Sequence, residues 1–538
     1  MNTQKKMVLH QNDKGLALIV VLLLMAIMAT MSAVAIHVAT SEMNAASFYK
    51  SRTQAFYAAE AGAEFAFNKL RDALQTLNST IPNTAPTISG YTFTAFSVQT
   101  IGTLTAQIKS GPYNGLTAYI TTYQITSKAH KTGTYAYSQI NVTVRDELVP
   151  IFQFGVFYNS DLELIPGQNM TFSGYSGLGR IHSNQNIYLA SSATFSINVP
   201  VTTAGSIYNR RKDDGTSPGP VRIQDANGVY HNLTTTNDSS SLTWRGDSQT
   251  TWLGSVKSGV NGISALNLPT ASGSSNPIDI IGDTAADSMY NRAGLKIVDG
   301  VGKDKNNNTV ELRYYDDTYR DPHNNHLIID PGGTASLNVN PVSTGSTALY
   351  DQREGHSMTV TTVDIGKLEQ STNAMTALNN PPVVGGTVQD ANILYIESSS
   401  VNSAVKLING ATLPSIGLTV ASKNPVYVKG DYNTTNNPTG NPVNNPAAIL
   451  ADAVTVLSNN WDDAHSNSSI GSRTATATTV NAAIMAGNKN TQGSQYSGGV
   501  ENLIRFLENW QGINFNYGGS LVCLWESQQA TGNWPGNW

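Results

Sequence analysis

Cysteine is almost absent from this chain of 538 residues, with Cys523 as its single thiol. An intramolecular disulfide is therefore excluded, although this says little about compartment, because oxidising compartments permit disulfides without requiring them. Charge is also scarce: Asp, Glu, Lys and Arg make up 13 % of the residues, and the net charge is −5. No Lys/Arg stripe is interleaved with aromatic residues, which argues against a nucleic-acid partner.

Serine, threonine, asparagine and glycine take the place of the missing charge. An average globular protein has ~25 % charged residues, about twice the share found here. Surfaces covered by hydroxyls and amides are typical of β-rich extracellular proteins. The length allows several domains with sizeable cores.

Near the N-terminus, residues 16–41 form an apolar run without a formal charge. As a helix, this run of about 26 residues measures ~39 Å, enough to cross a ~30 Å hydrocarbon layer. Lys5, Lys6 and Lys14 precede it. The excess of positive charge on that side places residues 1–15 in the cytoplasm and the rest of the chain outside.

The polar segment that follows, residues 42–78, has no proline and a single glycine, Gly62. Its apolar residues recur at spacings of three, four and seven, which is typical of one face of a helix. We therefore expect the membrane helix to continue as an amphipathic stalk, for a total of ~63 residues or ~95 Å.

Three interpretations of the N-terminus compete. The run is a plain signal anchor, a secretory signal peptide cut after Ala33-Val34-Ala35, or a segment cut on its cytoplasmic side, between Gly15 and Leu16. A secretory signal has no need of a helical stalk after its cleavage site. The stalk therefore favours the third interpretation.

Two segments resemble the PilX-type minor pilins of type IV pili. They are Lys14-Gly15 followed by LALIVVLLLMAIMATMSAVAI, and the more specific Gln54-Ala55-Phe56-Tyr57-Ala58-Ala59-Glu60-Ala61-Gly62. The resemblance implies that prepilin peptidase cuts between Gly15 and Leu16 and methylates the new N-terminus. It also implies that the helix packs with those of other pilins in a filament.

Most major pilins carry glutamate at the fifth mature position, where its carboxylate is thought to neutralise the N-terminal ammonium of a neighbouring subunit. Two charges in an apolar core are tolerable only when they are paired. Here that position is Val20. The missing acid favours a tip or priming subunit, which has no neighbour above it; the alternative is that glutamate is dispensable in a rarely incorporated subunit.

We expect four parts in the chain. They are a leader over 1–15, the transmembrane and stalk helix over 16–78, an antiparallel β domain over 79–150, and a large β-rich domain over 151–538 with an insertion at about 210–330. In the third part, near-alternating β-branched and aromatic residues predict a four-stranded meander, with strands at 91–101, 104–110, 118–130 and 135–148.

In the large part, short apolar runs recur between Asn, Gly and Ser turns. This pattern favours a parallel β-helix or related solenoid, and its irregular period keeps a pair of β-sandwiches as the alternative. Residues 499–510 predict a short amphipathic helix. The chain stops at ATGNWPGNW with no recognisable closing element, as a truncated open reading frame would.

Asp304, Asn306 and Asn308 have the D-x-N-x-N spacing of a calcium loop. An EF-hand needs Gly and Glu further on, where this chain has Thr309 and Tyr315. A polar hairpin turn is the favoured interpretation. We expect no metal and no cofactor.

Three other groups of titratable residues are weak candidates for chemistry, and each is better explained as a solvated surface. They are Glu60 and Glu64; Asp316, Asp317, Asp321, His323 and His326; and Trp461, Asp462, Asp463, Ala464 and His465. No nucleophile elbow, zinc-protease motif or phosphate loop is present.

The sequence thus predicts an α+β protein that is mostly β and is not an enzyme. The leading hypothesis is a minor pilin-like component for type IV pilus assembly, displaying an adhesive β-rich domain. Its partners would be other pilins, the pilus assembly machinery, prepilin peptidase, the bacterial inner membrane and a surface or glycan ligand, and it would move from that membrane to the pilus. The rival is a membrane-anchored or secreted polysaccharide-active enzyme on a β-helix, which paired carboxylates on one face would favour.

Overall fold

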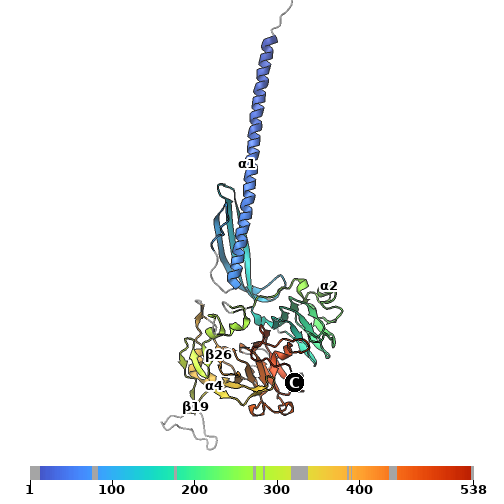
Figure 1. Cartoon of the computed structure of the whole chain (residues 1–538), viewed down its shortest axis with the longest axis vertical. Coiled ribbons are helices and arrows are strands. Elements are labelled where there is room, and N and C mark those ends of the chain that lie inside the picture. Colours follow the sequence, from blue (N-terminus) through green and yellow to red (C-terminus); the bar gives the residue numbers. More distant parts are fainter. Residues whose placement is uncertain are drawn as a thin grey trace, which may run out of the picture. The chain divides into compact units, whose positions relative to one another are not determined.

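The structure is a computed structural model. It describes residues 13–75, 83–174, 179–268, 270, 274–282, 285–316, 337–384, 387–388, 391–435 and 445–534 (Figure 1). The chain forms two compact units. Unit 1 comprises Met1–Ala106 and Ala118–Leu148, and unit 2 comprises Gln107–Thr117 and Val149–Trp538.

In unit 1, the helix α1 (Asp13–Gln75) runs for 63 residues without interruption (Figure 1). The predicted long N-terminal apolar helix is thus confirmed. No proline interrupts its sequence, so no backbone hydrogen bond is lost along its length.

A three-stranded sheet in the order β1-β2-β3 accompanies α1 (Figure 1). Its strands are β1 (Tyr91–Gln107), β2 (Thr117–Lys131) and β3 (Tyr137–Leu148). β2 and β3 pair antiparallel, from Tyr119 opposite Leu148 to His130 opposite Tyr137. The prediction of four strands is wrong, because 91–101 and most of 104–110 form the one strand β1. Gly102 lies inside that strand with open space around it and makes no turn.

Unit 2 begins with three successive turns of the chain that stack on one another. The first is β4 (Phe154–Tyr158), β5 (Leu162–Leu164) and β6 (Met170–Phe172); the second is β7 (Arg180–Ser183), β8 (Ile187–Leu189) and β9 (Phe195–Ile197); the third is β10 (Val201–Thr203), β11 (Ile207–Tyr208) and β12 (Val221–Gln224). Equivalent strands of successive turns pair in parallel.

The C-terminal half of unit 2 stacks in the same way. β26 (Ile393–Glu397), β28 (Leu418–Ser422), β30 (Ala447–Ala451), β33 (Ala483–Ala486) and β36 (Leu521–Cys523) pair in parallel, as do β23 (Thr359–Asp364), β27 (Ser403–Ile408), β29 (Val426–Lys429), β31 (Val454–Leu457) and β34 (Ile504–Phe506).

The remaining elements of unit 2 are shorter strands and helices. They are β13 (Tyr230–Leu233), β14 (Val256–Lys257), β15 (Leu295–Val298), β16 (Val301–Asp304), β17 (Thr309–Val310), β18 (Tyr314–Asp316), β19 (Leu337–Val339), β20 (Val342–Ser346), β21 (Tyr350–Asp351), β22 (His356–Ser357), β24 (Val383–Val384), β25 (Thr387–Val388), β32 (Thr478–Asn481), β35 (Phe515–Gly518), α2 (Trp244–Thr250), α3 (Met289–Arg292), α4 (Ile365–Gln370) and α5 (Thr372–Leu378). Within 210–330, the strands β12, β14 and β15 join the stacked sheets rather than standing apart from them.

A 12-stranded sheet joins the two halves of unit 2, in the order β14-β10-β7-β4-β36-β33-β30-β28-β26-β15-β16-β17. The first strand of the unit, β4, lies next to its last strand, β36, in parallel, with Val156 opposite Leu521 and Tyr158 opposite Cys523. We call this junction the seam. The strands from β4 to β14 in this sheet therefore occupy successive positions from the middle of the sheet to one edge. The strands from β15 to β36 then occupy positions from near the other edge back to the middle.

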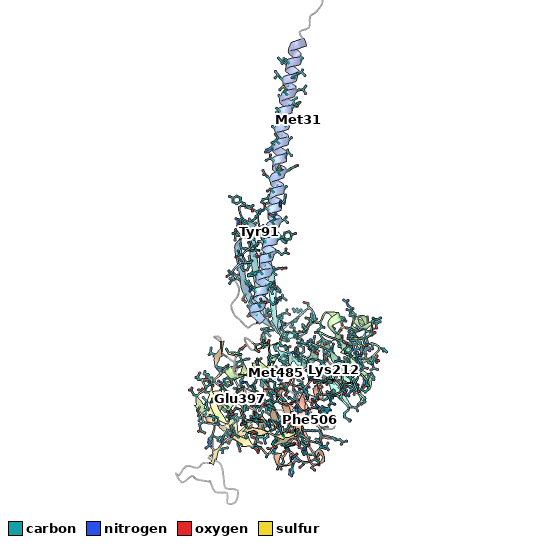
Figure 2. All side chains as sticks on the ribbon, viewed as in Figure 1. Met31, Tyr91, Lys212, Glu397, Met485 and Phe506 are labelled. Carbon is teal, nitrogen blue, oxygen red and sulfur yellow. The ribbon has the colours of Figure 1, made fainter. Side chains whose placement is uncertain are left out.

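An extended apolar core in unit 2 includes side chains from both sides of the seam. Figure 2 draws the described side chains and labels Lys212 in one half of the unit and Met485 in the other. Ile181 and Ile187 from one half and Ile449 and Ile484 from the other are fully buried. This continuous burial supplies the main stabilisation of the unit.

A regular solenoid is not confirmed, although the large domain is β-rich with several sheets as predicted. Val156 aligns with Ile181, Ile181 with Val201 and Val201 with Val256, so the interval between stacked residues is not constant. The helix predicted at 499–510 is wrong. Only Val500–Asn502 forms a turn of 3₁₀ helix, because the next residues enter β34 and pair with β31.

Candidate functional site: the N-terminal helix

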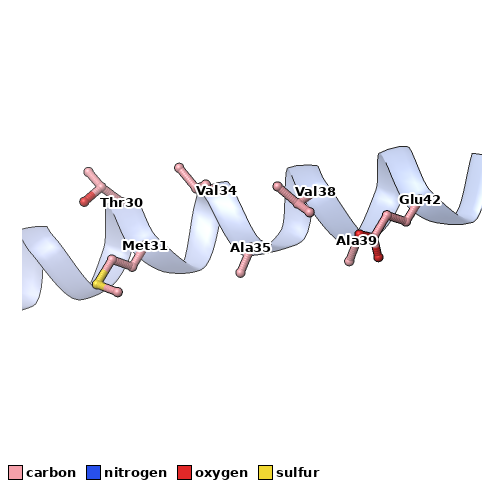
Figure 3. Close-up of a pocket in the computed structure, with 7 residues that line it drawn as sticks. All are labelled: Thr30, Met31, Val34, Ala35, Val38, Ala39 and Glu42. Atoms are coloured by element: carbon pink, nitrogen blue, oxygen red, sulfur yellow. The ribbon is translucent and has the colours of Figure 1, made fainter.

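The N-terminal half of α1 exposes its apolar side chains. Leu18, Val20 and Met31 are each about half exposed or more, and α1 is long and apolar enough to cross a membrane by length and composition. Figure 3 shows Thr30, Met31, Val34, Ala35, Val38, Ala39 and Glu42 along one face of the helix. An isolated helix with this surface is stable only when lipid or other helices cover it.

The predicted processing residues Gly15 and Leu16 fall in the first turns of α1, two and three residues after its start at Asp13. Val20 is 49 % exposed, one turn further along the same helix. The first acidic residue after Val20 is Glu42, more than five helical turns away at 3.6 residues per turn. The helix therefore carries no carboxylate between Leu16 and Glu42.

The Gln54–Gly62 motif packs α1 against the sheet of unit 1. Ala55, Ala58 and Ala59 are buried, whereas Phe56 and Tyr57 are exposed. Small residues on the covered face let the helix backbone approach the strands closely. The buried stripe continues with Ala63, Ala66 and Leu70, against Val98, Tyr123 and Ile125 of the strands.

Gly62 is the point of closest approach. A Cβ atom at this position would lie 2.4 Å from Ser127 Oγ and 2.5 Å from Phe93 Cε1. The small residues of the motif are therefore explained by packing. The side chains of Glu60 and Glu64 are exposed on the solvated side of the helix, as expected for a solvated surface.

One known protein family matches this part of the molecule. Residues 14–64 match the family model PilX N-terminal, so the resemblance drawn from Lys14-Gly15 and Gln54–Gly62 is confirmed over that segment. The competence-associated pilin ComZ from Thermus thermophilus is a listed structural neighbour, at 11 % sequence identity and a TM-score of 0.24, covering 91 % of this chain and 96 % of its own. No curated protein matches the sequence.

The calcium-like segment is a hairpin turn between β16 and β17. Asp304 Oδ1 accepts hydrogen bonds from the backbone N–H groups of Asn306 (2.9 Å) and Asn308 (2.8 Å), and Asn307 adopts a positive φ of 65°. Antiparallel pairing of Lys303 with Thr309 closes the hairpin. The carboxylate and the asparagines thus serve the turn, as the polar-hairpin interpretation predicts.

The other sequence candidates in unit 2 are Asp316–His326 and Trp461–His465. Asp316 ends β18, and Asp317, Asp321, His323 and His326 lie outside the described residues. At 461–465, Trp461 Nε1 donates to Asp463 Oδ1 (2.8 Å), Asp463 also pairs with Lys406, and His465 meets Asp462 at 3.2 Å. Within the described part of the chain, no group of three or more His, Cys, Asp or Glu side chains is placed to hold a metal ion.

Sequence reasoning missed a buried carboxylate at the seam. Glu163 is 0 % exposed, and burial raises the pKa of its carboxyl to about 7. Glu501 lies close by, and its pKa is also raised by burial. The sequence Leu-Glu-Leu of this strand predicts a glutamate that points outward into solvent. In the structure, residues 496–501, which are far away in the sequence, cover the Glu163 side chain.

Two further buried groups were not predicted. His182 on β7 contacts Thr202 Oγ1 through Nδ1 (3.0 Å) and Asn184 Oδ1 through Nε2 (3.2 Å), and burial lowers its pKa to about 4. Asp452 holds the segment 527–530. Its carboxylate accepts hydrogen bonds from Ser527 Oγ (2.6 Å) and from the backbone N–H groups of Gln528 (2.6 Å) and Gln529 (3.0 Å).

Proposed function

We propose that this protein is a minor pilin-like structural component for type IV pilus assembly. The observation that carries the proposal is the coincidence of the PilX N-terminal match, 14–64, with one continuous helix. The apolar half of that helix is exposed, and its other half is packed on a sheet. Such a helix suits a membrane before assembly and a bundle of pilin helices afterwards.

In this proposal, prepilin peptidase cuts between Gly15 and Leu16 and methylates Leu16. The helix then anchors the chain in the bacterial inner membrane, with residues before it in the cytoplasm, and later enters the pilus. Unit 2 is displayed outward as an adhesive module for a surface or a glycan.

The missing acid at Val20 supports a tip or priming position. A subunit with Val20 offers no carboxylate to the ammonium of a subunit above it, and an unpaired charge in an apolar core is strongly unfavourable. Only the top position of a filament avoids this loss.

The carboxylates gathered in unit 2 do not favour the polysaccharide-active alternative. A general acid or base must come within hydrogen-bond reach of the scissile bond. Glu163 is fully buried, and Glu501 Oε1 accepts hydrogen bonds from Ile165 N–H and Tyr496 O–H.

The N-terminus of the native protein tests the proposal. Mass spectrometry should find a chain that starts at N-methylated Leu16 in cells with prepilin peptidase and an uncut leader in cells without it. A start at Ile36 in both strains would indicate ordinary secretion and contradict the proposal. An intact leader in both strains would leave a simple membrane anchor. Purified pili from a tagged strain then show whether the chain is incorporated.

A further inference from the structure

Glu163 in the strand β5 combines an outward-facing strand position with complete burial. Its neighbours Leu162 and Leu164 point into the core, so the alternation of a strand directs Glu163 outward. It is nevertheless fully buried. The Thr491 hydroxyl lies beside it and favours its ionised form, but within the described residues no hydrogen bond of normal geometry reaches either carboxylate oxygen. An ionised carboxylate in such a place is costly.

The cover over Glu163 comes from the other half of unit 2. Glu163 forms a parallel bridge with Gly499, and a Cβ atom on Gly498 would lie 2.5 Å from Glu163 Oε1. The Thr491 hydroxyl fixes this segment by accepting hydrogen bonds from the backbone N–H groups of Ser497 (2.9 Å) and Gly498 (2.8 Å). The glycines thus let the backbone lie directly on the carboxyl group.

Glu163 therefore stands at the seam, beside the β4–β36 pair. Asn159 N–H donates to Cys523 O (2.9 Å), and Ile165 N–H donates to Glu501 Oε1 (3.2 Å), so hydrogen bonds cross the seam on both sides of Glu163. A change in the charge of Glu163 acts on the contact between the two halves.

The charges around Glu163 do not neutralise it. The titratable groups that face it are Tyr158, Tyr188, Lys212, Asp213, Tyr496 and Glu501. The cations near this group among the described residues are Lys212 and Arg211, and both are already paired: Lys212 with Asp161 at 3.0 Å, and Arg211, which lies over the Tyr496 ring, with Asp213 at 2.5 Å. Ionised Glu163 would add a negative charge beside Glu501 and Asp213.

We propose that Glu163 is a proton-operated latch of the seam. In its neutral form it lets residues 488–502 close on β5. In its ionised form it loosens that contact, so that the seam opens locally while the cores on either side stay folded. This proposal is independent of the pilin function.

The pKa of the carboxyl gives the direction of the response. Burial raises it from 4.5 to about 7, Thr491 and Lys212 oppose the rise, and Glu501 and Asp213 add to it. A folded-state pKa above the unfolded value means that the stabilisation is complete below about pH 4.5 and is lost as the pH rises through about 7. The latch is closed in mildly acidic surroundings and loosened in mildly alkaline ones.

Hydrogen–deuterium exchange of the full chain in detergent tests the latch. Rates in peptides covering 159–165 and 496–503 are compared at pH 6.0 and 8.5, after correction for intrinsic exchange. A carboxyl whose pKa falls from about 7 to 4.5 on opening should raise the opening equilibrium roughly tenfold between these values. In the wild type, the increase should level off above about pH 7.

Glu163→Gln should keep both peptides protected at either pH, because the amide stays neutral. Glu508→Gln is the matched control, since Glu508 is also buried but accepts hydrogen bonds from Ser458 N–H and Oγ–H, both at 2.6 Å, away from the seam. That variant should keep the wild-type response in the seam peptides. Rates in the wild type that do not change with pH, or an unchanged response in Glu163→Gln, would overturn the proposal. If a variant does not fold, the pH dependence of exchange in the wild-type seam peptides by itself tests the proposal.

Discussion

Gly62 of α1 and Ser127 of β2 face each other so closely that a Cβ atom on the glycine would lie 2.4 Å from the serine Oγ. Ser127 is itself fully buried. The contact fixes how near the helix comes to the sheet of unit 1. It also explains why the one glycine in the downstream half of a 63-residue helix sits inside the alanine-rich stripe.

Gly62→Ala should destabilise unit 1 in spite of the better helix propensity of alanine. Overpacking costs typically about 1–3 kcal/mol, against a gain of about 1 kcal/mol for removing a mid-helix glycine. Limited proteolysis in a urea series, read by mass spectrometry at sites in 91–148, measures the change. Gly102→Ala is the control, because Gly102 lies in β1 with no atom within 4 Å of an added Cβ. Equal midpoints for the two variants would contradict the packing explanation.

Val20→Glu should raise the number of copies of the chain in each pilus, if its position is set by the missing acid. The new carboxylate can pair with the ammonium of a subunit above, which makes internal positions tolerable. Quantitative mass spectrometry of purified pili counts the copies. Val21→Glu places the same charge one residue away, about 100° around the helix, and should not have this effect. An unchanged count for Val20→Glu would favour the alternative that the acid is dispensable.

Asp452→Asn should release the segment 527–530 before the rest of unit 2 unfolds. Hydrogen bonds to a charged group contribute about 1.5–3 kcal/mol, and the amide would also direct N–H groups at backbone N–H groups. We expect new protease cleavage in 526–534 under native conditions. Asp299→Asn is a suitable comparison, because Asp299 lies in the β15–β16 turn and accepts an exposed hydrogen bond from the backbone N–H of Ser399. Protection of 526–534 in Asp452→Asn would show that other contacts hold the segment.

His182 should destabilise unit 2 in acid, in opposition to the stabilisation that neutral Glu163 supplies there. Its folded-state pKa, about 4, lies below its ordinary value of 6.5, mainly because of burial. The neutral imidazole's contribution is therefore complete above about pH 6.5 and is lost as the pH falls toward 4, on the order of 3 kcal/mol in all.

Tryptophan fluorescence measures this loss in unit 2, because all seven tryptophans of the chain lie there. The thermal midpoint of His182→Gln should rise relative to that of the wild type as the pH falls from 6.5 to 4.5, because Glu163 titrates in both proteins and its effect cancels in the difference. His465→Gln, at a side chain that is 69 % exposed, should follow the wild type. If the thermal midpoint of His182→Gln changed with pH by the same amount as that of the wild type, this imidazole would be ruled out as the acid-sensitive group.

The sequence predicted what depends on local pattern. The absence of proline and the spacing of apolar residues indicated α1, and the spacing of Asp304, Asn306 and Asn308 was correctly interpreted as a turn. Local signals also misled: the break expected between the strands 91–101 and 104–110 lies inside β1, and 499–510 has helical spacing but its residues 504–506 form β34, which pairs with β31. Tertiary pairing overrides such short propensities.

The burial of Glu163 was beyond the reach of the sequence. Its strand neighbours reveal which way it points, but the segment that covers it belongs to the other end of unit 2. The same holds for Gly62, whose role is visible only once Ser127 is placed beside it. Contacts between residues far apart in the chain leave no periodic trace.

The seam has a consequence for how the chain reaches its folded state. The strand β4 can pair with β36 only after the intervening chain has been synthesised, because Val156 lies opposite Leu521. Contacts of such high sequence separation slow folding, and a waiting strand edge invites pairing with other chains. The yield of folded protein should therefore depend on how long the free edge of β4 stays unpaired during folding.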